Sequence, residues 1–187
     1  MSMSIPARDS DRTKSAILHA AQQAFSTRGY ASTGVREITA AAGVNASLVS
    51  RYFGSKEKLF EAALSAALDS TLITSLSKAE FGKRIVAAFA ADNVGRINPL
   101  PMMLLATADP GAREIADRLL RELVMVPLAR WFGAADADER AARLVVLASG
   151  FFLYRLHYPL PTWENGLAPA SRAWLERAFQ SVIDDPE

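Results

Sequence analysis

The stretch VREITAAAGVNASLVSRYFGSKEK, residues 35–58, decides how the rest of the chain is interpreted. It contains two short segments with helical spacing of apolar residues, separated by Gly43. Ile38 and Ala42 give the first segment a small apolar face. Gly43 can end this first helix, because glycine tolerates the left-handed conformation found at many helix ends.

The second segment begins at Asn45, a residue type favoured at the N-cap of a helix. Leu48, Val49 and Phe53 carry its apolar bulk, and Val49 and Phe53 lie four residues apart on one face. The residues left to face outward are Ala46, Ser47, Ser50, Arg51 and Tyr52. Two short helices joined by a tight glycine turn, with a polar outer face on the second, are the arrangement that places a recognition helix in the major groove of DNA.

About a dozen positions in one register extend this pattern: Gly29-Tyr30, Val35, Ile38, Ala42-Gly43-Val44, Tyr52-Phe53, Ser55-Lys56-Glu57 and Leu59. At this spacing they resemble the signature of the TetR family of transcriptional regulators. The resemblance covers roughly residues 13 to 64. It implies a sequence-specific DNA-binding regulator that acts as a homodimer on a palindromic operator in double-stranded DNA.

The resemblance also implies which residues contact DNA. Arg36 would reach a base edge or a phosphate, and Ala46, Ser47 and Ser50 would meet bases. Tyr52 and Lys56 would meet phosphates; Lys56 also opens a helix after Ser55, where the amides and the helix dipole attract an anion. The predicted DNA-binding residues are Thr33, Arg36, Asn45, Ala46, Ser47, Ser50, Arg51, Tyr52 and Lys56.

Two positions depart from the family pattern. Gly34 stands where a hydroxyl residue usually caps the first helix of the motif, so either Ser32 or Thr33 would have to replace that cap. Ser50 stands where tyrosine is frequent, which removes an aromatic contact. We expect Arg51 to supply part of the missing readout, because arginine can pair bidentately with guanine.

Composition narrows the class of protein. Half of the 187 residues are apolar, which excludes a disordered chain, and there is no cysteine for disulfides or thiol catalysis. The N-terminal MSMSIPARDSDRTK has no apolar core, so no signal peptide is expected. The longest apolar run, residues 144–154, is shorter than the roughly 20 residues of a membrane span. A cytoplasmic protein with no membrane partner is therefore expected.

Charge is divided unevenly along the chain although the net charge is only +1. Residues 1–58 hold eight Lys and Arg against four Asp and Glu, and the remainder holds 13 against 16. This asymmetry is typical of a DNA-binding domain joined to a domain of another kind. We predict a flexible arm over 1–12, a DNA-binding domain over 13–58, and an effector-binding and dimerisation domain over 59–187.

The remaining pattern predicts an all-α fold of about nine helices. An apolar stripe at helical spacing begins after Thr13, and Gly29 ends that helix. A helix from Lys56 leaves the DNA-binding domain and would link it to the rest. Further helices are expected near residues 81–89, 102–108, 110–127 and 139–158 and from 169 onward, with a loop over 91–101 and a kink or end at Pro127.

The helix over residues 139–158 is apolar around much of its circumference and needs a second surface to bury against. Paired with the final helix and a second copy of both, it would form a twofold four-helix interface, which the family resemblance also implies. The alternative is that both helices form the inner core of a monomer. The predicted interface residues are Leu144, Leu147, Phe151, Trp174, Ala178 and Val182.

The region from Phe81 to Trp131 is rich in Met, Leu and Phe, and an apolar pocket between helices is a common ligand site. The family resemblance implies a small effector whose binding separates the two DNA-binding heads. The candidate lining residues are Phe81, Phe89, Met102, Met103, Leu105 and Leu123. The alternative for each is plain core packing.

No catalytic constellation is visible: His19 and His157 have no evident partners, and no cofactor or metal site is expected. The principal interpretation is a repressor released by a small apolar or amphipathic effector. An activator remains open, because the sign of regulation depends on where the operator lies. A helical ligand-binding or adaptor module that no longer binds DNA is the alternative, suggested by Gly34 and Ser50.

Overall fold

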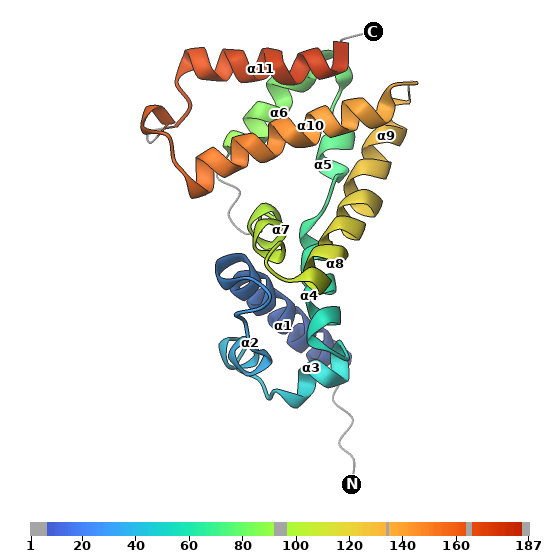
Figure 1. Cartoon of the computed structure of the whole chain (residues 1–187), viewed down its shortest axis with the longest axis vertical. Coiled ribbons are helices and arrows are strands. Elements are labelled where there is room, and N and C mark those ends of the chain that lie inside the picture. Colours follow the sequence, from blue (N-terminus) through green and yellow to red (C-terminus); the bar gives the residue numbers. More distant parts are fainter. Residues whose placement is uncertain (1–6, 92–96, 134, 164–165, 185–187) are drawn as a thin grey trace. The chain divides into compact units, whose positions relative to one another are not determined.

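The computed structural model describes residues 7–91, 97–133, 135–163 and 166–184. These residues form α-helices, short 3-10 segments and π-helical segments, with no strand among them, which confirms the predicted all-α class. Eleven α-helices are labelled in this part of the chain (Figure 1). One of them, α5, is a single turn, and α8 and α9 continue one another, which reconciles this number with the nine expected.

The chain packs as two compact units. The first comprises residues 1–68 and 97–120, and the second comprises residues 69–96 and 121–187. Packing therefore divides the chain elsewhere than between residues 58 and 59. The predicted functional domains, 13–58 and 59–187, stay a prediction, because a division by packing does not test which residues bind DNA or an effector.

The first unit contains six helices: α1 (Ala7–Arg28), α2 (Val35–Ala41), α3 (Ser47–Tyr52), α4 (Lys56–Ala67), α7 (Leu100–Ala106) and α8 (Pro110–Leu120). Helix α1 begins before Thr13, so residues 7–12 are helical and the expected arm is wrong for them; residues 1–6 lie outside the described part. The polar residues Ser10 and Asp11 suit the first turns of a helix, which hydropathy spacing does not detect.

The core of this unit forms where α1 packs along α4. Ile17, Phe25 and Phe60 are fully buried. The Phe25 and Phe60 rings meet edge-on with centroids 5.2 Å apart, a favoured aromatic geometry. Gln22 adds a polar tie between the two helices by donating to the Ala63 carbonyl oxygen at 3.0 Å. The stripe predicted on the first helix is therefore what anchors α4, whose first residues belong to the candidate DNA surface.

Helices α7 and α8 complete the first unit. Asp109 caps α8, its carboxylate accepting from the Ala112 amide at 2.9 Å. Arg118 of α8 pairs with Glu61 of α4 at 2.6 Å. On the other side, Leu105 of α7 lies so close to Gly29 that a Cβ there would come within 3.1 Å of the Leu105 Cβ.

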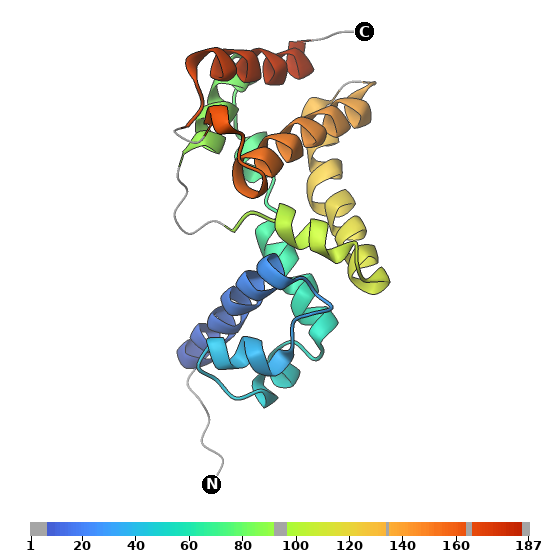
Figure 2. The same cartoon turned by 60° about the vertical axis from the view of Figure 1, so that its left-hand side comes forward.

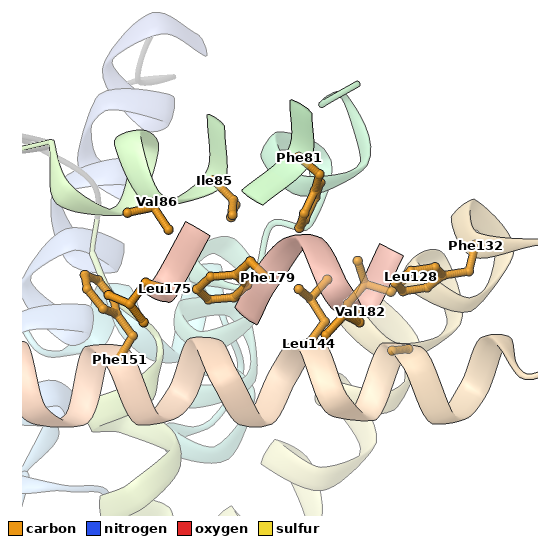
Figure 3. Packing of buried hydrophobic residues seen from close by; sticks show 11 residues of the cluster. Phe81, Ile85, Val86, Leu128, Phe132, Leu144, Phe151, Leu175, Phe179 and Val182 are labelled. Atoms are coloured by element: carbon orange, nitrogen blue, oxygen red, sulfur yellow. The ribbon is translucent and has the colours of Figure 1, made fainter. Parts of the chain in front are cut away.

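The second unit contains α5 (Thr71–Thr74), α6 (Phe81–Ala90), α9 (Val126–Phe132), α10 (Ala137–Phe152) and α11 (Pro169–Asp184). Figure 3 shows its core, with side chains of α11 between those of α6 on one side and α10 on the other. Leu128 and Phe132 of α9 close one end of this cluster. The apolar side chains of these four helices thus bury one another within a single chain.

The dimer-interface prediction needs correction at three positions. Leu144, Phe151 and Val182 are buried in the core of the second unit, so they are not available to a partner (Figure 3). Trp174 is 54% exposed, and Leu147 and Ala178 are half-buried. Because α10 is apolar around much of its circumference, its sequence alone did not indicate which side faces inward. The interface itself stays a prediction.

The predicted effector-lining residues fall in different units. Met102, Met103 and Leu105 lie on α7 in the first unit, and Phe81, Phe89 and Leu123 lie in the second. Phe81 and Met102 are fully buried core residues of their respective units. These two side chains therefore act as core residues, which is the alternative stated for them above.

Pro127 disturbs the long helix as expected, but without ending it. The five residues Arg121–Met125 are π-helical and lead directly into α9. Proline has no amide hydrogen, so the regular helical bond from residue 127 to the Leu123 carbonyl oxygen cannot form. The hydroxyl of Ser70 donates to that oxygen instead, at 3.0 Å.

No single described helix is long and apolar enough to cross a membrane. The segments 56–74 and 78–90 meet that criterion only when taken together, and a 95° bend separates them.

Candidate nucleic-acid interface

The turn between α2 and α3 has the hydrogen bonds of a Schellman helix end. The Val44 amide donates to the Thr39 carbonyl oxygen at 2.9 Å, and the Gly43 amide donates to that of Ala40 at 3.1 Å. Gly43 has φ of +67°, the left-handed conformation that its position was predicted to require. The two helices therefore leave the turn in a defined geometry (Figures 1 and 2).

Asn45 fixes the start of α3. Its side-chain oxygen accepts hydrogen bonds from both the amide and the hydroxyl of Ser47, each at 2.9 Å. Ala46 occupies the N-cap itself, one residue later than predicted, but the Asn45 side chain still satisfies an amide that the helix leaves without an internal partner. The Asn45 amide group and the hydroxyl oxygen of Ser47 keep hydrogen-bonding capacity, because these bonds use only the other halves of the two side chains.

The faces of α3 divide as the sequence indicated. Val49 is buried toward the core, while Ser47, Ser50 and Arg51 are exposed. Ala46 and Tyr52 are half-buried. The Arg51 guanidinium carbon lies 5.9 Å from the centroid of the Tyr52 ring. The exposed face therefore carries small polar groups and a fixed positive charge at one end.

Helix α2 begins without a hydroxyl cap. Gly34 occupies the N-cap with φ of −93°, and its amide donates to the Glu37 carboxylate at 3.3 Å. The same carboxylate pairs with Arg28 at the end of α1. The cap expected from Ser32 or Thr33 is therefore not formed, and the only backbone amide that donates to Glu37 from this helix end is that of the N-cap residue itself, Gly34. Arg36, one turn into α2, is exposed.

Thr33 does not belong to the exposed surface. It is only 1% exposed. Its hydroxyl donates to the Gly29 carbonyl oxygen at 2.7 Å, and the Ala24 carbonyl oxygen is a second, longer acceptor at 3.3 Å. The side chain thus stabilises the end of α1 and has turned away from solvent. A DNA contact through the Thr33 hydroxyl is incompatible with this burial, so Thr33 is removed from the candidate set.

Glu57 occupies much of the α4 N-terminus, where a phosphate was expected. The Ser55 hydroxyl caps the helix by accepting from the Lys58 amide at 3.2 Å. Hydrogen bonds from the Glu57 amide itself, from Ser55 and from Tyr30 lower the pKa of the Glu57 carboxyl. The carboxylate therefore sits where the helix dipole favours an anion. What remains for a phosphate is the ammonium group of Lys56, rather than the amides of this helix end.

Lys56 is half-buried, and its ammonium nitrogen lies 4.2 Å from the centroid of the Tyr30 ring. Burial and the hydrogen bond to Glu57 raise the pKa of Tyr30 to about 12, so its hydroxyl keeps its proton at neutral pH. The start of the α1–α2 connection is thereby joined to the start of α4.

Lys14 is a further cation near this surface that the sequence pattern did not single out. It is exposed, and its ammonium nitrogen lies 5.9 Å from the ring centroid of Phe53, the residue that follows α3. The sequence signal was a basic residue one turn before the buried Ile17. Lys14 lies near the end of α3 because of the way α1 packs, and the spacing of residues in the sequence does not predict that packing.

Two short helices set by a Schellman turn, with an exposed polar face on the second, define a helix-turn-helix protein. Two family comparisons identify its class. Residues 17–63 match the bacterial regulatory proteins of the tetR family, and residues 79–183 match the tetracyclin repressor-like C-terminal domain. The chain belongs to the TetR family and is a DNA-binding transcriptional regulator. This is a regulatory family and not an enzyme family.

Solved structures agree with this assignment. A TetR-family regulator from Streptomyces coelicolor is 27% identical over 94% of this chain and 96% of its own, with a TM-score of 0.57. The structure of a TetR-family transcriptional regulator from Rhodococcus sp. matches over 92% of this chain and 99% of its own chain. The two sequences are 18% identical, and the TM-score is 0.72. The multidrug binding protein EbrR, solved with proflavin, is 16% identical over 91% and 99%, with a TM-score of 0.56. The last two show the shared fold alone. No curated protein matches the chain significantly.

Proposed function

We propose that the protein is a homodimeric repressor that reads a palindromic operator with α3 and is released by a small apolar or amphipathic effector. The observation that carries the DNA part is the exposed polar face of α3. Asn45 fixes its start, and buried Val49 fixes its rotation about the helix axis. A recognition helix needs such a fixed start and rotation, because base-edge hydrogen bonds depend on direction.

We assign roles to the candidate residues by chemistry. Ser47, Ser50 and Arg51 read base edges, with Arg51 suited to guanine. Ala46 offers an apolar contact of the kind made with a thymine methyl group. Tyr52 and Lys56 contact phosphates, which supply affinity without sequence information.

The remaining candidates hold the motif or extend it. Asn45 acts mainly by capping α3, with its amide group left for a DNA contact. Arg36 on exposed α2 contacts a phosphate or a base edge. Lys14 is added as a phosphate contact beside the end of α3, because its charge lies near Phe53 and is exposed.

A dimer follows from what an operator requires. Two recognition helices engage two half-sites about 34 Å apart, one turn of DNA, so the operator reflects the twofold symmetry of the protein. Exposed apolar side chains support burial of α10 and α11 against a second copy: Val146 is 70% exposed and Trp174 is 54% exposed. Large apolar side chains exposed to this degree favour an interface.

The effector would bind in the second unit, where aromatic side chains gather around Phe89. Its ring centroid lies 4.7 Å from that of Phe152 and 5.9 Å from those of Phe151 and Phe179. The proflavin complex of EbrR is an example of a small molecule bound by this fold. Release would be a population shift, in which the effector binds better to the state with separated heads.

The connections between the units are suited to carry this shift. The chain leaves the first unit after Leu68 and again after Leu120. Immediately beyond these points, the Ser70 hydroxyl holds the Leu123 carbonyl oxygen that Pro127 leaves unpaired. The two segments that follow the boundaries at Leu68 and Leu120 are therefore held together within the second unit by one hydrogen bond.

The test begins with selection of genomic fragments by the purified full-length protein at moderate salt. Mobility-shift titrations on the recovered site then compare wild type, Arg51→Ala and Lys56→Ala over a range of salt concentrations. Lys56→Ala should weaken binding to all sequences and reduce the slope of log affinity against log salt by about one for each phosphate that is no longer neutralised. Arg51→Ala should mainly reduce discrimination at one base pair in each half-site, by about 1–3 kcal/mol.

Arg130→Ala and Lys83→Ala serve as matched controls, because they remove the same charges from exposed positions on α9 and α6. They should leave affinity and salt slope near wild type. Equal losses from the controls would mean that net charge, and not this surface, governs binding. Failure to recover any palindromic site would favour the adaptor alternative.

A further inference from the structure

We propose that Tyr30 is a positioning residue for DNA binding: its ring supports the ammonium group of Lys56, and Glu57 holds its hydroxyl, so that Lys56 is presented to a phosphate. This inference rests on the phosphate contact proposed for Lys56. It adds two residues, neither of which touches DNA, to the machinery that sets the affinity.

Tyr30 is a rigid support. It is 8% exposed, and its ring packs against two buried rings of the first unit. The centroid of Phe60 lies 5.3 Å away at an interplanar angle of 65°, and that of Phe25 lies 6.0 Å away. Because the neighbouring rings leave little room to move, the ring face that remains open is fixed in direction.

Lys56 uses that ring face. Its ammonium nitrogen lies 4.2 Å from the Tyr30 centroid, well within the roughly 6 Å range of a cation–π interaction. A lysine side chain is a flexible four-carbon stem, so an unsupported ammonium group loses much freedom when it binds a phosphate. An ammonium group already resting on the ring has lost part of that freedom beforehand, which strengthens the phosphate contact.

Glu57 fixes the far end of Tyr30. The tyrosine hydroxyl donates to its carboxylate, which also receives hydrogen bonds from Ser55 and from the Glu57 amide. The donors also reduce the repulsion between Glu57 and a phosphate at the adjacent Lys56, because part of the carboxylate charge is already compensated.

The experiment is a double-mutant cycle on the full-length protein with the operator recovered by genomic selection. Operator affinity and its salt slope are measured for wild type, Tyr30→Leu, Lys56→Ala and the double variant. Tyr30→Leu should weaken binding about two- to fivefold for each subunit, as expected when a partly exposed cation–π interaction is removed. In the Lys56→Ala background, the same change should have almost no effect.

Tyr30→Phe is the conservative variant, because it keeps the ring under Lys56 and removes only the hydroxyl. It should retain more of the affinity than Tyr30→Leu. Thermal unfolding of each variant shows whether a loss of affinity merely follows a loss of folded protein.

Three results would overturn the inference. If Tyr30→Leu weakens binding equally in the presence and absence of Lys56, Tyr30 acts by general packing alone. If Tyr30→Phe loses as much as Tyr30→Leu, the ring is not the support. If Lys56→Ala itself leaves affinity and salt slope unchanged, the proposed phosphate contact of Lys56 fails first, and the positioning role fails with it.

A second measurement decides the matter if Tyr30→Leu does not fold. Protons above an aromatic ring resonate upfield, so the ε-methylene signal of Lys56 in the wild-type protein should be shifted upfield relative to Lys83. Lys56→Arg assigns the signal by its disappearance. A Lys56 signal at the ordinary position would exclude the ring contact in solution.

Discussion

Gly82 of α6 and Gln180 of α11 are hydrogen-bonded where these two helices pack together. The Gly82 amide donates to the Gln180 side-chain oxygen at 2.9 Å, and the Gln180 amide nitrogen donates to the Lys78 carbonyl oxygen at 3.0 Å. A Cβ at position 82 would lie 1.9 Å from the Glu176 carbonyl oxygen. The Gln180 side chain therefore caps the N-terminus of α6 from a neighbouring helix. Position 82 has room only for glycine.

Gly82→Ala should destabilise the second unit. The new methyl group meets backbone atoms of α11, which cannot move aside without separating α11 from α6. We expect a loss of about 1–3 kcal/mol or more in the free energy of unfolding, the usual cost of overpacking. Chemical denaturation followed by circular dichroism measures it.

Gly150→Ala is the matched control for this change. Gly150 lies inside α10, and a Cβ there would meet nothing within 4 Å. Alanine should therefore stabilise the helix by roughly 0.5–1 kcal/mol. Equal and small effects of the two substitutions would mean that α6 and α11 do not approach each other this closely.

Gly43→Ala should loosen the turn before α3. No atom lies within 4 Å of the position of the new Cβ, so the cost comes from the left-handed backbone alone, about 1–2 kcal/mol. Operator affinity should fall along with thermal stability. Gly34→Ser is the control, because φ of −93° suits any residue and a serine cap should stabilise α2. Unchanged stability of Gly43→Ala would contradict the left-handed turn.

Alkaline pH should destabilise the first unit through Tyr30. The pKa of its phenol is about 12 in the folded chain, above its ordinary value of 10.0, so the folded state holds the proton more tightly. This stabilisation is fully present below pH 10 and is lost as the pH rises through 12. Tyr30→Phe should lose less stability than wild type between about pH 9 and pH 11.5 in denaturant titrations; equal losses would remove Tyr30 as the cause.

Val146→Asp and Trp174→Ala should weaken the dimer while each chain stays folded, because both side chains are largely exposed in the single chain. Sedimentation velocity measures the dissociation, and circular dichroism reports the fold. Phe179→Ala is the contrast: Phe179 is fully buried between α6 and α10, so its loss should cost about 3–5 kcal/mol of stability (Figure 3). Dimers of unchanged affinity in both exposed variants would place the interface elsewhere.

The DNA-binding motif was predictable from the sequence because its determinants are local. Gly43, the Asn45 cap and the i, i+4 pair of Val49 and Phe53 act within a few residues of one another, and helix ends follow from such short-range chemistry. The family pattern over the same residues added the functional class. The sequence-based prediction failed at Thr33, whose hydroxyl donates to the Gly29 carbonyl oxygen inside the unit. It also failed at the start of α2, where no hydroxyl cap forms and Glu37 instead accepts from the Gly34 amide.

By itself, the sequence determined the all-α class, the glycine turn, the polar face of α3 and the disturbance of the helix at Pro127, since each depends on neighbours along the chain. Only the tertiary structure decided which side of α10 faces inward, why Gly82 must be glycine, and that Lys56 rests on Tyr30. These features join residues far apart in sequence. The hydropathy pattern does not indicate which of several apolar helix faces packs against which other helix. Packing selects among them, because close-packed interiors accept few arrangements of the same side chains.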